Sequence, residues 1–221
     1  MISDRDTNNV YFSERLKTDS RFSDTCKQIT DILDSFGVKP KYLPDTKDIW
    51  ARDYMPIQVA KDKFIEYRYD PDYLQGTGKD RREIKTYPDI VCDSINLKTI
   101  KTDIILDGGN VVKSSNAIIL TDKIVKENKR TYNRKVLLNR LHELFEVEKV
   151  ILIPWDTECE YGHSDGMLRF IDNNTVLISG LYDTDVDDFK QQILRPLEQN
   201  GLNWKWLKCS DKEEDERNTV L

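Results

Sequence analysis

"GMLRFIDNNTVLISG" (residues 166–180) contains two short apolar runs on either side of the polar pair Asn173-Asn174. Runs of this length, rich in branched and aromatic side chains and separated by turn-forming residues, predict two strands joined by a tight turn. A helical pattern follows, and after it comes the strand-like run "LNWKWLK" (residues 202–208). The apolar residues of the helical pattern are Val186, Phe189, Ile193 and Leu197. The order of elements is therefore strand, strand, helix, strand.

The same order occurs twice upstream. The strands "YMPIQVA" and "KFIEYRY" meet at a polar turn, and a short helix near residues 89–95 and the strand "TIKTDIIL" follow them. The second occurrence consists of "GNVVK", "AIILTD", a helix and "KVILIPW". This helix carries Val136, Leu137, Leu141, Leu144 and Phe145 on its apolar side. Repetition of one supersecondary unit predicts an α/β fold in which equivalent loops gather on one face.

The chain opens with half of such a unit. Residues 22–36 form an amphipathic helical pattern that ends at Gly37, and the short strand "VKPKYL" follows. The spacing predicts that one face of this helix is apolar. The residues on it are Phe22, Cys26, Ile29, Leu33 and Phe36.

A polar motif introduces each complete repeat: "DIWARD", "LDGGN" and "YGHSDG". Their anchor residues Asp53, Asn110 and Asp165 recur at nearly equal intervals along the chain. Because equivalent loops of a repeat fold meet near a common axis, we expect the three motifs to converge, with His163 at the shared centre. Each motif also has a structural interpretation. Asp and Gly after a strand commonly cap turns, and Arg52 and Arg169 could form structural ion pairs.

Composition excludes several classes of protein. The net charge is -6, the sequence pI is about 5.1, and there is no basic stripe, so a nucleic-acid partner is not expected. No run is long and apolar enough to span a bilayer, and the N-terminal residues lack a signal-peptide core, so a cytoplasmic protein without a membrane partner is predicted. The four cysteines are far apart, which predicts reduced thiols and no metal site. The acidic run at residues 211–216 is expected to be a solvated loop.

"DIWARDYMPI", "LDGGN" and "YGHSDGMLRF" together resemble the motifs of the guanidine-modifying pentein superfamily. The resemblance is strongest to its agmatine deiminase and Porphyromonas-type peptidylarginine deiminase branch, and it extends from about Lys39 to the C-terminus. It implies an α/β propeller of repeated strand-strand-helix-strand units, of which this chain holds about three and a half of five. Residues 1–221 would then be a single pentein-like domain, the N-terminal portion of a longer enzyme.

The resemblance also implies roles for individual residues. Asp53 and Asp165 would hold a planar guanidinium between carboxylates, and His163 would protonate the departing ammonia and then activate water. Asp107 would orient His163 or accept a substrate donor. The other predicted substrate-binding residues are Trp50, Arg52, Gly108, Gly109, Asn110 and Arg169. Such a mechanism uses neither a cofactor nor a metal, and the partner would be agmatine, a related small guanidino compound or arginine in a peptide, as in polyamine metabolism.

The nucleophile of this family is a cysteine near the C-terminus, and no cysteine of this chain has that context. Buried or incidental thiols are the favoured interpretation of Cys26, Cys92, Cys159 and Cys209. We therefore expect the isolated chain to turn over no substrate. The alternative function is a non-catalytic guanidinium-binding or assembly fragment of the same fold. An incomplete propeller would leave a strand edge open at residues 202–207, where self-association is expected.

Overall fold

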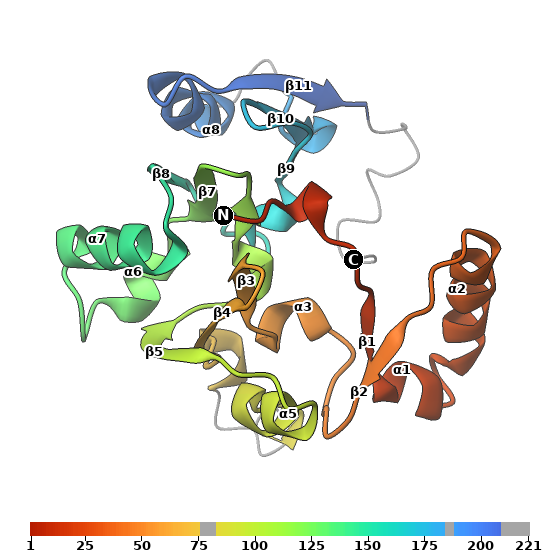
Figure 1. Ribbon diagram of the computed structural model, residues 1–221. Helices are drawn as coiled ribbons and strands as arrows, with labels where there is room; N and C mark the ends of the chain where they lie inside the picture. Colours follow the sequence, from red (N-terminus) through yellow and green to blue (C-terminus); the bar gives the residue numbers. More distant parts are fainter. Residues whose placement is uncertain (76–82, 184–187, 209–221) are drawn as a thin grey trace. The chain divides into compact units, whose positions relative to one another are not determined.

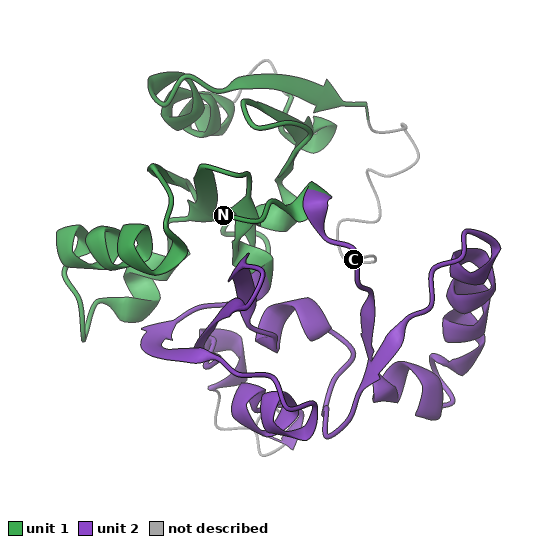
Figure 2. Cartoon of the chain, in the orientation of Figure 1, with its two compact units in different colours: residues 1–5, 109–221 green, residues 6–108 purple. Residues whose placement is uncertain are grey.

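The structure, a computed structural model, describes residues 1–75, 83–183 and 188–208 (Figure 1). It consists of short helices and several small sheets, so the predicted α/β class is confirmed. The chain divides into two compact units (Figure 2). Unit 1 comprises residues 1–5 and 109–221, and unit 2 comprises residues 6–108. Each unit is described below by itself.

Unit 2 contains the first complete repeat. Strands β3 (Ile57–Ala60) and β4 (Lys63–Arg68) pair antiparallel, and β5 (Ile100–Ile105) pairs parallel with β4. Helix α5 (Pro88–Ser94) precedes β5 and buries Val91 and Cys92. The predicted order strand, strand, helix, strand is confirmed here, including the turn between β3 and β4. Two short turns flank the sheet, α3 (Ala51–Tyr54) and η2 (Asp72–Leu74).

The N-terminal half repeat in unit 2 differs from the prediction. Strands β1 (Tyr11–Ser13) and β2 (Lys41–Leu43) pair parallel, and α1 (Glu14–Thr18) and α2 (Ser23–Ser35) connect them. The helix and its end at Gly37, where φ is +72°, are confirmed. The apolar face of this helix is largely unpacked, because only Cys26 of α2 is buried and Phe36 beyond it is 79% exposed. Among the described residues this sheet has two strands, which is too narrow to cover the helix.

Unit 1 contains the second repeat. Strand β6 (Val112–Lys113) pairs antiparallel with β7 (Ala117–Thr121), and β8 (Lys149–Ile153) pairs parallel with β7. Helix α7 (Arg134–Phe145) buries Leu137, Leu141 and Phe145, as predicted, but Val136 is exposed. A further short helix, α6 (Lys123–Asn128), was not predicted. It begins directly after β7, and its first residue is buried.

The third repeat also lies in unit 1. Strands β9 (Leu168–Phe170) and β10 (Thr175–Ser179) form the predicted hairpin, and β11 (Asn203–Leu207) pairs parallel with β10. Helix α8 (Asp188–Gln199) buries Ile193, Leu194 and Leu197. Residues of both sheets, among them Ile151 of β8 and Ile178 of β10, share one hydrophobic core with α8. Val186, Cys209 and the acidic run 211–216 lie outside the described residues.

Single-turn 3-10 helices complete the described fold. They are η1 (Asp4–Asp6), η3 (Gly108–Asn110), η4 (Ser164–Gly166) and η5 (Gly180–Tyr182). In the part of the chain that the structure describes, no helix has the length and hydropathy needed to cross a lipid bilayer. Two of the turns, η3 and η4, coincide with the "GGN" and "SDG" segments of the polar motifs.

Candidate functional site

The "DIWARD" segment of unit 2 is shaped by Asp48. Its Oδ1 accepts a hydrogen bond of 2.8 Å from the Trp50 backbone N–H, and its Oδ2 accepts one of 3.1 Å from the Thr86 hydroxyl. Burial raises the pKa of the Asp48 carboxyl, and these hydrogen bonds work in the opposite direction. The turn presents the Trp50 indole, which is 49% exposed, and the exposed Arg52. Sequence reasoning missed Asp48, although an Asp two residues before a capped N–H is the signature of an Asx turn.

Helix α3, which carries Asp53, is held by Tyr67 and by the chain at Gly108. The Tyr67 hydroxyl lies 2.5 Å from the Asp53 carbonyl oxygen and 2.9 Å from that of Met55. A Cβ atom at Gly108 would lie 1.9 Å from the Arg52 carbonyl oxygen. The "WARD" and "LDGG" motifs are therefore in direct contact, and the absent side chain at Gly108 permits that contact.

An acidic and phenolic cluster surrounds this contact in unit 2. Asp107 is 2% exposed, and Asp53 is half-buried. Burial raises the pKa of the phenols of Tyr67, Tyr69 and Tyr73, and the negative charges of Asp53 and Asp107 raise it further. Both carboxylates thus act on the same three phenols. The region is negative and partly shielded from water, which favours a cationic ligand.

Replacement of Tyr67 by Phe tests the support of α3. Tyr67→Phe removes the hydroxyl that hydrogen-bonds to the carbonyl oxygens of Asp53 and Met55. We therefore expect a loss of about 1–2 kcal/mol in the free energy of unfolding. Chemical denaturation measures this loss. Tyr87→Phe in the same unit is the matched control, because Tyr87 is 42% exposed, and it should change stability by less than about 0.5 kcal/mol. Equal effects of the two substitutions would contradict the role assigned to the Tyr67 hydroxyl.

In unit 1, Asn110 connects the "GGN" and "GHSDG" motifs. Its side-chain oxygen accepts a hydrogen bond of 2.8 Å from the Thr121 N–H and one of 3.2 Å from the Ser164 N–H. The Ser164 hydroxyl donates to the Ile119 carbonyl at 3.2 Å. His163, which is half-buried, precedes Ser164 at the start of η4. The structure therefore brings Asn110 and the His163 loop together, as predicted for two of the three motifs.

Asp165 already holds a guanidinium in the structure. The Arg169 Nη2 atom lies 3.3 Å from the Asp165 Oδ2 atom, and the side chains are 46% and 17% exposed. The structural interpretation of Arg169 as an ion-pair partner is thus confirmed. The His163 ring, two residues from Asp165, lies 6.0 Å from the Tyr161 ring between centroids. An imidazole and a carboxylate that accepts a guanidinium are accordingly presented by one loop.

Comparison with known proteins decides the family. The model of the Porphyromonas-type peptidyl-arginine deiminase family matches residues 18–203. The chain belongs to this family. No curated protein matches its sequence.

Solved structures of deiminases share the fold of this family member. C. jejuni agmatine deiminase is 16% identical, with a TM-score of 0.66 over 93% of this chain and 74% of that chain. A cysteine-to-serine variant of that enzyme with substrate bound gives a TM-score of 0.64 at 16% identity over the same shares of the two chains. Agmatine deiminase of Enterococcus faecalis is 17% identical, with a TM-score of 0.60 over 84% of this chain and 57% of that chain. The resemblance read from the three motifs is confirmed.

The described cysteines of this deiminase-family chain differ in exposure. Cys26 and Cys92 are buried free thiols, and Cys159 is an exposed one. Burial raises the pKa of the Cys92 thiol to about 12, and the nearby negative charge of Glu66 acts in the same direction. A thiol that ionises so reluctantly is a poor nucleophile at neutral pH. The interpretation of Cys26 and Cys92 as buried structural thiols is confirmed.

Alkylation should distinguish these thiols. In a Cys209→Ser background at pH 8, iodoacetamide is expected to modify Cys159 completely before Cys26 or Cys92 is measurably labelled, because reaction needs an accessible thiolate. Peptide mass spectrometry over a time course reads out each site. Unfolding in denaturant should make all three react alike. Labelling of Cys92 as fast as Cys159 in the native protein would contradict the burial assigned to it.

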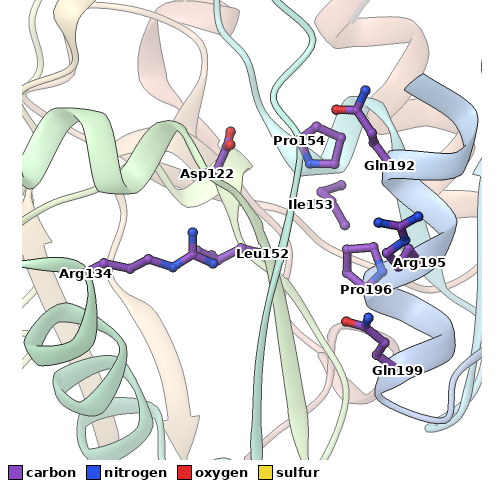
Figure 3. A pocket seen from close by; sticks show the side chains of 9 residues that line it. All are labelled: Asp122, Arg134, Leu152, Ile153, Pro154, Gln192, Arg195, Pro196 and Gln199. Carbon is purple, nitrogen blue, oxygen red and sulfur yellow. The ribbon is translucent and has the colours of Figure 1, made fainter. Parts of the chain in front are cut away.

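Unit 1 also contains an open groove of about 230 Å³ (Figure 3). Figure 3 shows Arg134 entering from α7, and Gln192 and Arg195 from α8 on the other side. The groove is lined by Asp122, Arg134, Leu152, Ile153, Pro154, Gln192, Arg195, Pro196 and Gln199. None of the predicted site residues is among them. Among the described residues, no group of three or more His, Cys, Asp or Glu side chains is arranged so that it could hold a metal ion.

Proposed function

We propose that the chain belongs to a guanidine deiminase, a hydrolase of C–N bonds that releases ammonia from agmatine or an arginine derivative. The family and its fold support guanidine-modifying hydrolase chemistry. The observation that carries the proposal is the ion pair between the Asp165 carboxylate and the Arg169 guanidinium. Asp165 follows His163 by two residues in the same loop. A carboxylate that accepts a guanidinium from its own chain has the chemistry needed to accept one from a ligand.

The proposed reaction gives a task to each predicted carboxylate. Asp53 and Asp165 would hold the guanidinium, and Asp107 would add negative charge. A cysteine thiolate attacks the guanidinium carbon, and the C–N bond to the departing nitrogen breaks as His163 protonates it. Water activated by His163 then displaces the thiolate from the thiouronium carbon. The residues that line the substrate would be Trp50, Arg52, Gly108, Gly109, Asn110 and Arg169.

The nucleophilic cysteine would come from a segment that residues 1–221 do not contain. The sheets support this arrangement, because β3-β4-β5, β6-β7-β8 and β9-β10-β11 each have an antiparallel strand beside a parallel pair. The described part of the β1-β2 sheet has the parallel pair alone. We place these sheets in about three and a half of the five repeats of a pentein propeller, in one domain, with a further strand beside β1. The β11 edge would then be open to self-association.

A non-catalytic guanidinium-binding fragment is the second candidate. It is favoured by the burial of Cys26 and Cys92, which leaves Cys159 as the exposed thiol among the described residues. Free thiols and a small cationic ligand suit the cytoplasm and polyamine metabolism in either case. The two candidates share a binding site and differ in turnover.

Calorimetric titration with agmatine tests the shared site. Asp53→Asn and Asp165→Asn should each weaken binding by roughly tenfold or more, because each removes a charge-assisted partner of the guanidinium. Putrescine, which lacks the guanidino group, is the ligand control. Asp62→Asn at the exposed turn between β3 and β4 is the protein control. Equal binding of putrescine and agmatine, or no effect of either site substitution, would remove the proposal.

Ammonia release separates the two candidates. The chain as it stands should release none from agmatine. A longer chain, extended with the cysteine-containing C-terminal segment of a relative, should release ammonia if the deiminase proposal holds. Binding without turnover in the folded, extended chain would favour the fragment that only binds.

A further inference from the structure

Two buried side chains hold the loop that carries His163. The Lys123 ammonium donates to the Tyr161 carbonyl oxygen at 2.7 Å, and the Thr121 hydroxyl donates to the Gly162 carbonyl oxygen at 2.7 Å. These carbonyls belong to the two residues immediately before His163. Both donors come from one place in the fold, the end of β7 and the first residue of α6 (Figure 1).

Lys123 is the first residue of the short helix α6, and this position alone does not explain why its side chain is buried. Its side chain is 1% exposed, and its Nζ atom lies 3.5 Å from the Oε1 atom of Glu127, whose side chain is 6% exposed. Lysine is almost never fully buried unless it is paired, because desolvating the ammonium is costly. A lysine directed to water would begin α6 equally well. The second partner of the ammonium, the Tyr161 carbonyl oxygen, gives a reason for the burial, because it lets Lys123 hold the His163 loop.

Thr121 connects the same loop to the "GGN" motif. It is 0% exposed, and its backbone N–H donates to the Asn110 oxygen that also accepts from the Ser164 N–H. The Thr121 hydroxyl therefore holds the peptide group before His163, and the Asn110 side chain holds the one after it. Gly162 adopts φ of +64° within this arrangement, a conformation that glycine adopts without strain.

We propose that Thr121 and Lys123 are positioning residues that set the direction of the His163 imidazole. Neither needs to touch a ligand, because they act through the carbonyls of residues 161 and 162. The meaning of that direction for proton transfer rests on the proposed function, since a misplacement of about 1 Å costs a general acid up to about a hundredfold in rate. The direction itself can be measured without any ligand.

The histidine content makes this measurement simple. The chain has two histidines, so imidazole NMR signals need one substitution for assignment. His142 on α7, whose Nδ1 lies 3.1 Å from the Val147 carbonyl oxygen, serves as the internal reference for folding. The variants are Thr121→Val, which keeps the shape but removes the hydroxyl, and Lys123→Met, which removes the ammonium. Thr121→Ser restores the donor, and Lys129→Met at the exposed end of α6 is the matched control.

The expected result is specific to His163. In Thr121→Val and in Lys123→Met, the chemical shift and pKa of His163 should change, whereas the chemical shift of His142 stays constant. Thr121→Ser should return His163 to its original values, and Lys129→Met should leave them unchanged. A general loss of stability would not move one imidazole and spare the other.

The opposite result is equally clear. An unchanged His163 signal and pKa in folded Thr121→Val, or a change that Thr121→Ser fails to reverse, would overturn the proposal. If Lys123→Met does not fold, the comparison of Thr121→Val with Thr121→Ser decides alone. Failure of the unmodified chain to bind agmatine would remove the proposed function. It would leave the ligand-free His163 result, and so the positioning role, standing.

Discussion

Gly108→Ala should destabilise unit 2 by about 3 kcal/mol, because a methyl group there has no space to enter. A Cβ atom would lie 1.9 Å from the Arg52 carbonyl oxygen, 2.7 Å from the Tyr67 hydroxyl and 3.0 Å from the Arg52 carbonyl carbon. Two of these atoms are backbone, so rotation of a side chain cannot relieve the overlap. The chain at Gly108 must separate from α3, and the hydrogen bonds between Tyr67 and α3 must weaken with it.

The melting temperature should fall by roughly 6–12 °C, as expected for this loss in a chain of this size. Differential scanning calorimetry and denaturant titration measure it. Gly37→Ala is the control, because Gly37 has a φ of +72° and no described atom within 4 Å of the added Cβ, and it should cost only about 1 kcal/mol. Displacement of α3 moves Asp53, so agmatine binding should weaken in Gly108→Ala and not in Gly37→Ala. Similar losses of stability in both variants would refute the close contact.

Local chemistry explains which parts of the fold could be predicted. The turns at Asn173-Asn174 and between β3 and β4 follow from polar residues between apolar runs, so the hairpins appear where the sequence places them. The end of α2 at Gly37 is equally local. In contrast, the apolar face of α2 indicates that another part of a protein should cover it, but the pattern does not say which part. Whether a neighbouring sheet is wide enough to do so is a tertiary property, and Phe36 remains exposed.

The site divides in the same way. Motif spacing indicated Asp53, His163 and Asp165, because these residue types suit a guanidinium and a proton transfer. It did not indicate Lys123, because a lysine after a strand is normally expected to be exposed to solvent. Its burial is tolerated because Glu127 and the Tyr161 carbonyl oxygen lie close to its ammonium group. Supporting residues of this kind contribute through tertiary contacts, which leave no periodic signal in the sequence.

Gly162→Ala should destabilise unit 1 strongly, with an expected loss of about 4 kcal/mol from overlap and backbone strain combined. The new Cβ atom would lie 2.6 Å from the Cδ1 and Nε1 atoms of Trp155 and 3.1 Å from the Cδ atom of Lys123. The Lys126 ammonium lies over the Trp155 ring at 4.1 Å from the centroid, so displacement of the ring would also weaken this cation–π contact. The backbone φ of +64° adds strain for any L side chain.

Gly201→Ala separates the two causes. Gly201 lies in the same unit with a φ of +68°, and no described atom comes within 4 Å of an added Cβ, so this variant should lose only the strain of about 1 kcal/mol. The difference between the two free energies of unfolding, measured by denaturant titration, is then the overlap with Trp155 and Lys123. Trp155→Val should recover part of that difference when it is combined with Gly162→Ala, because it removes the ring atoms nearest the methyl group. If the double variant is no more stable than additivity predicts, the overlap with Trp155 is not the cause, and the close packing of the His163 loop on this ring must be rejected.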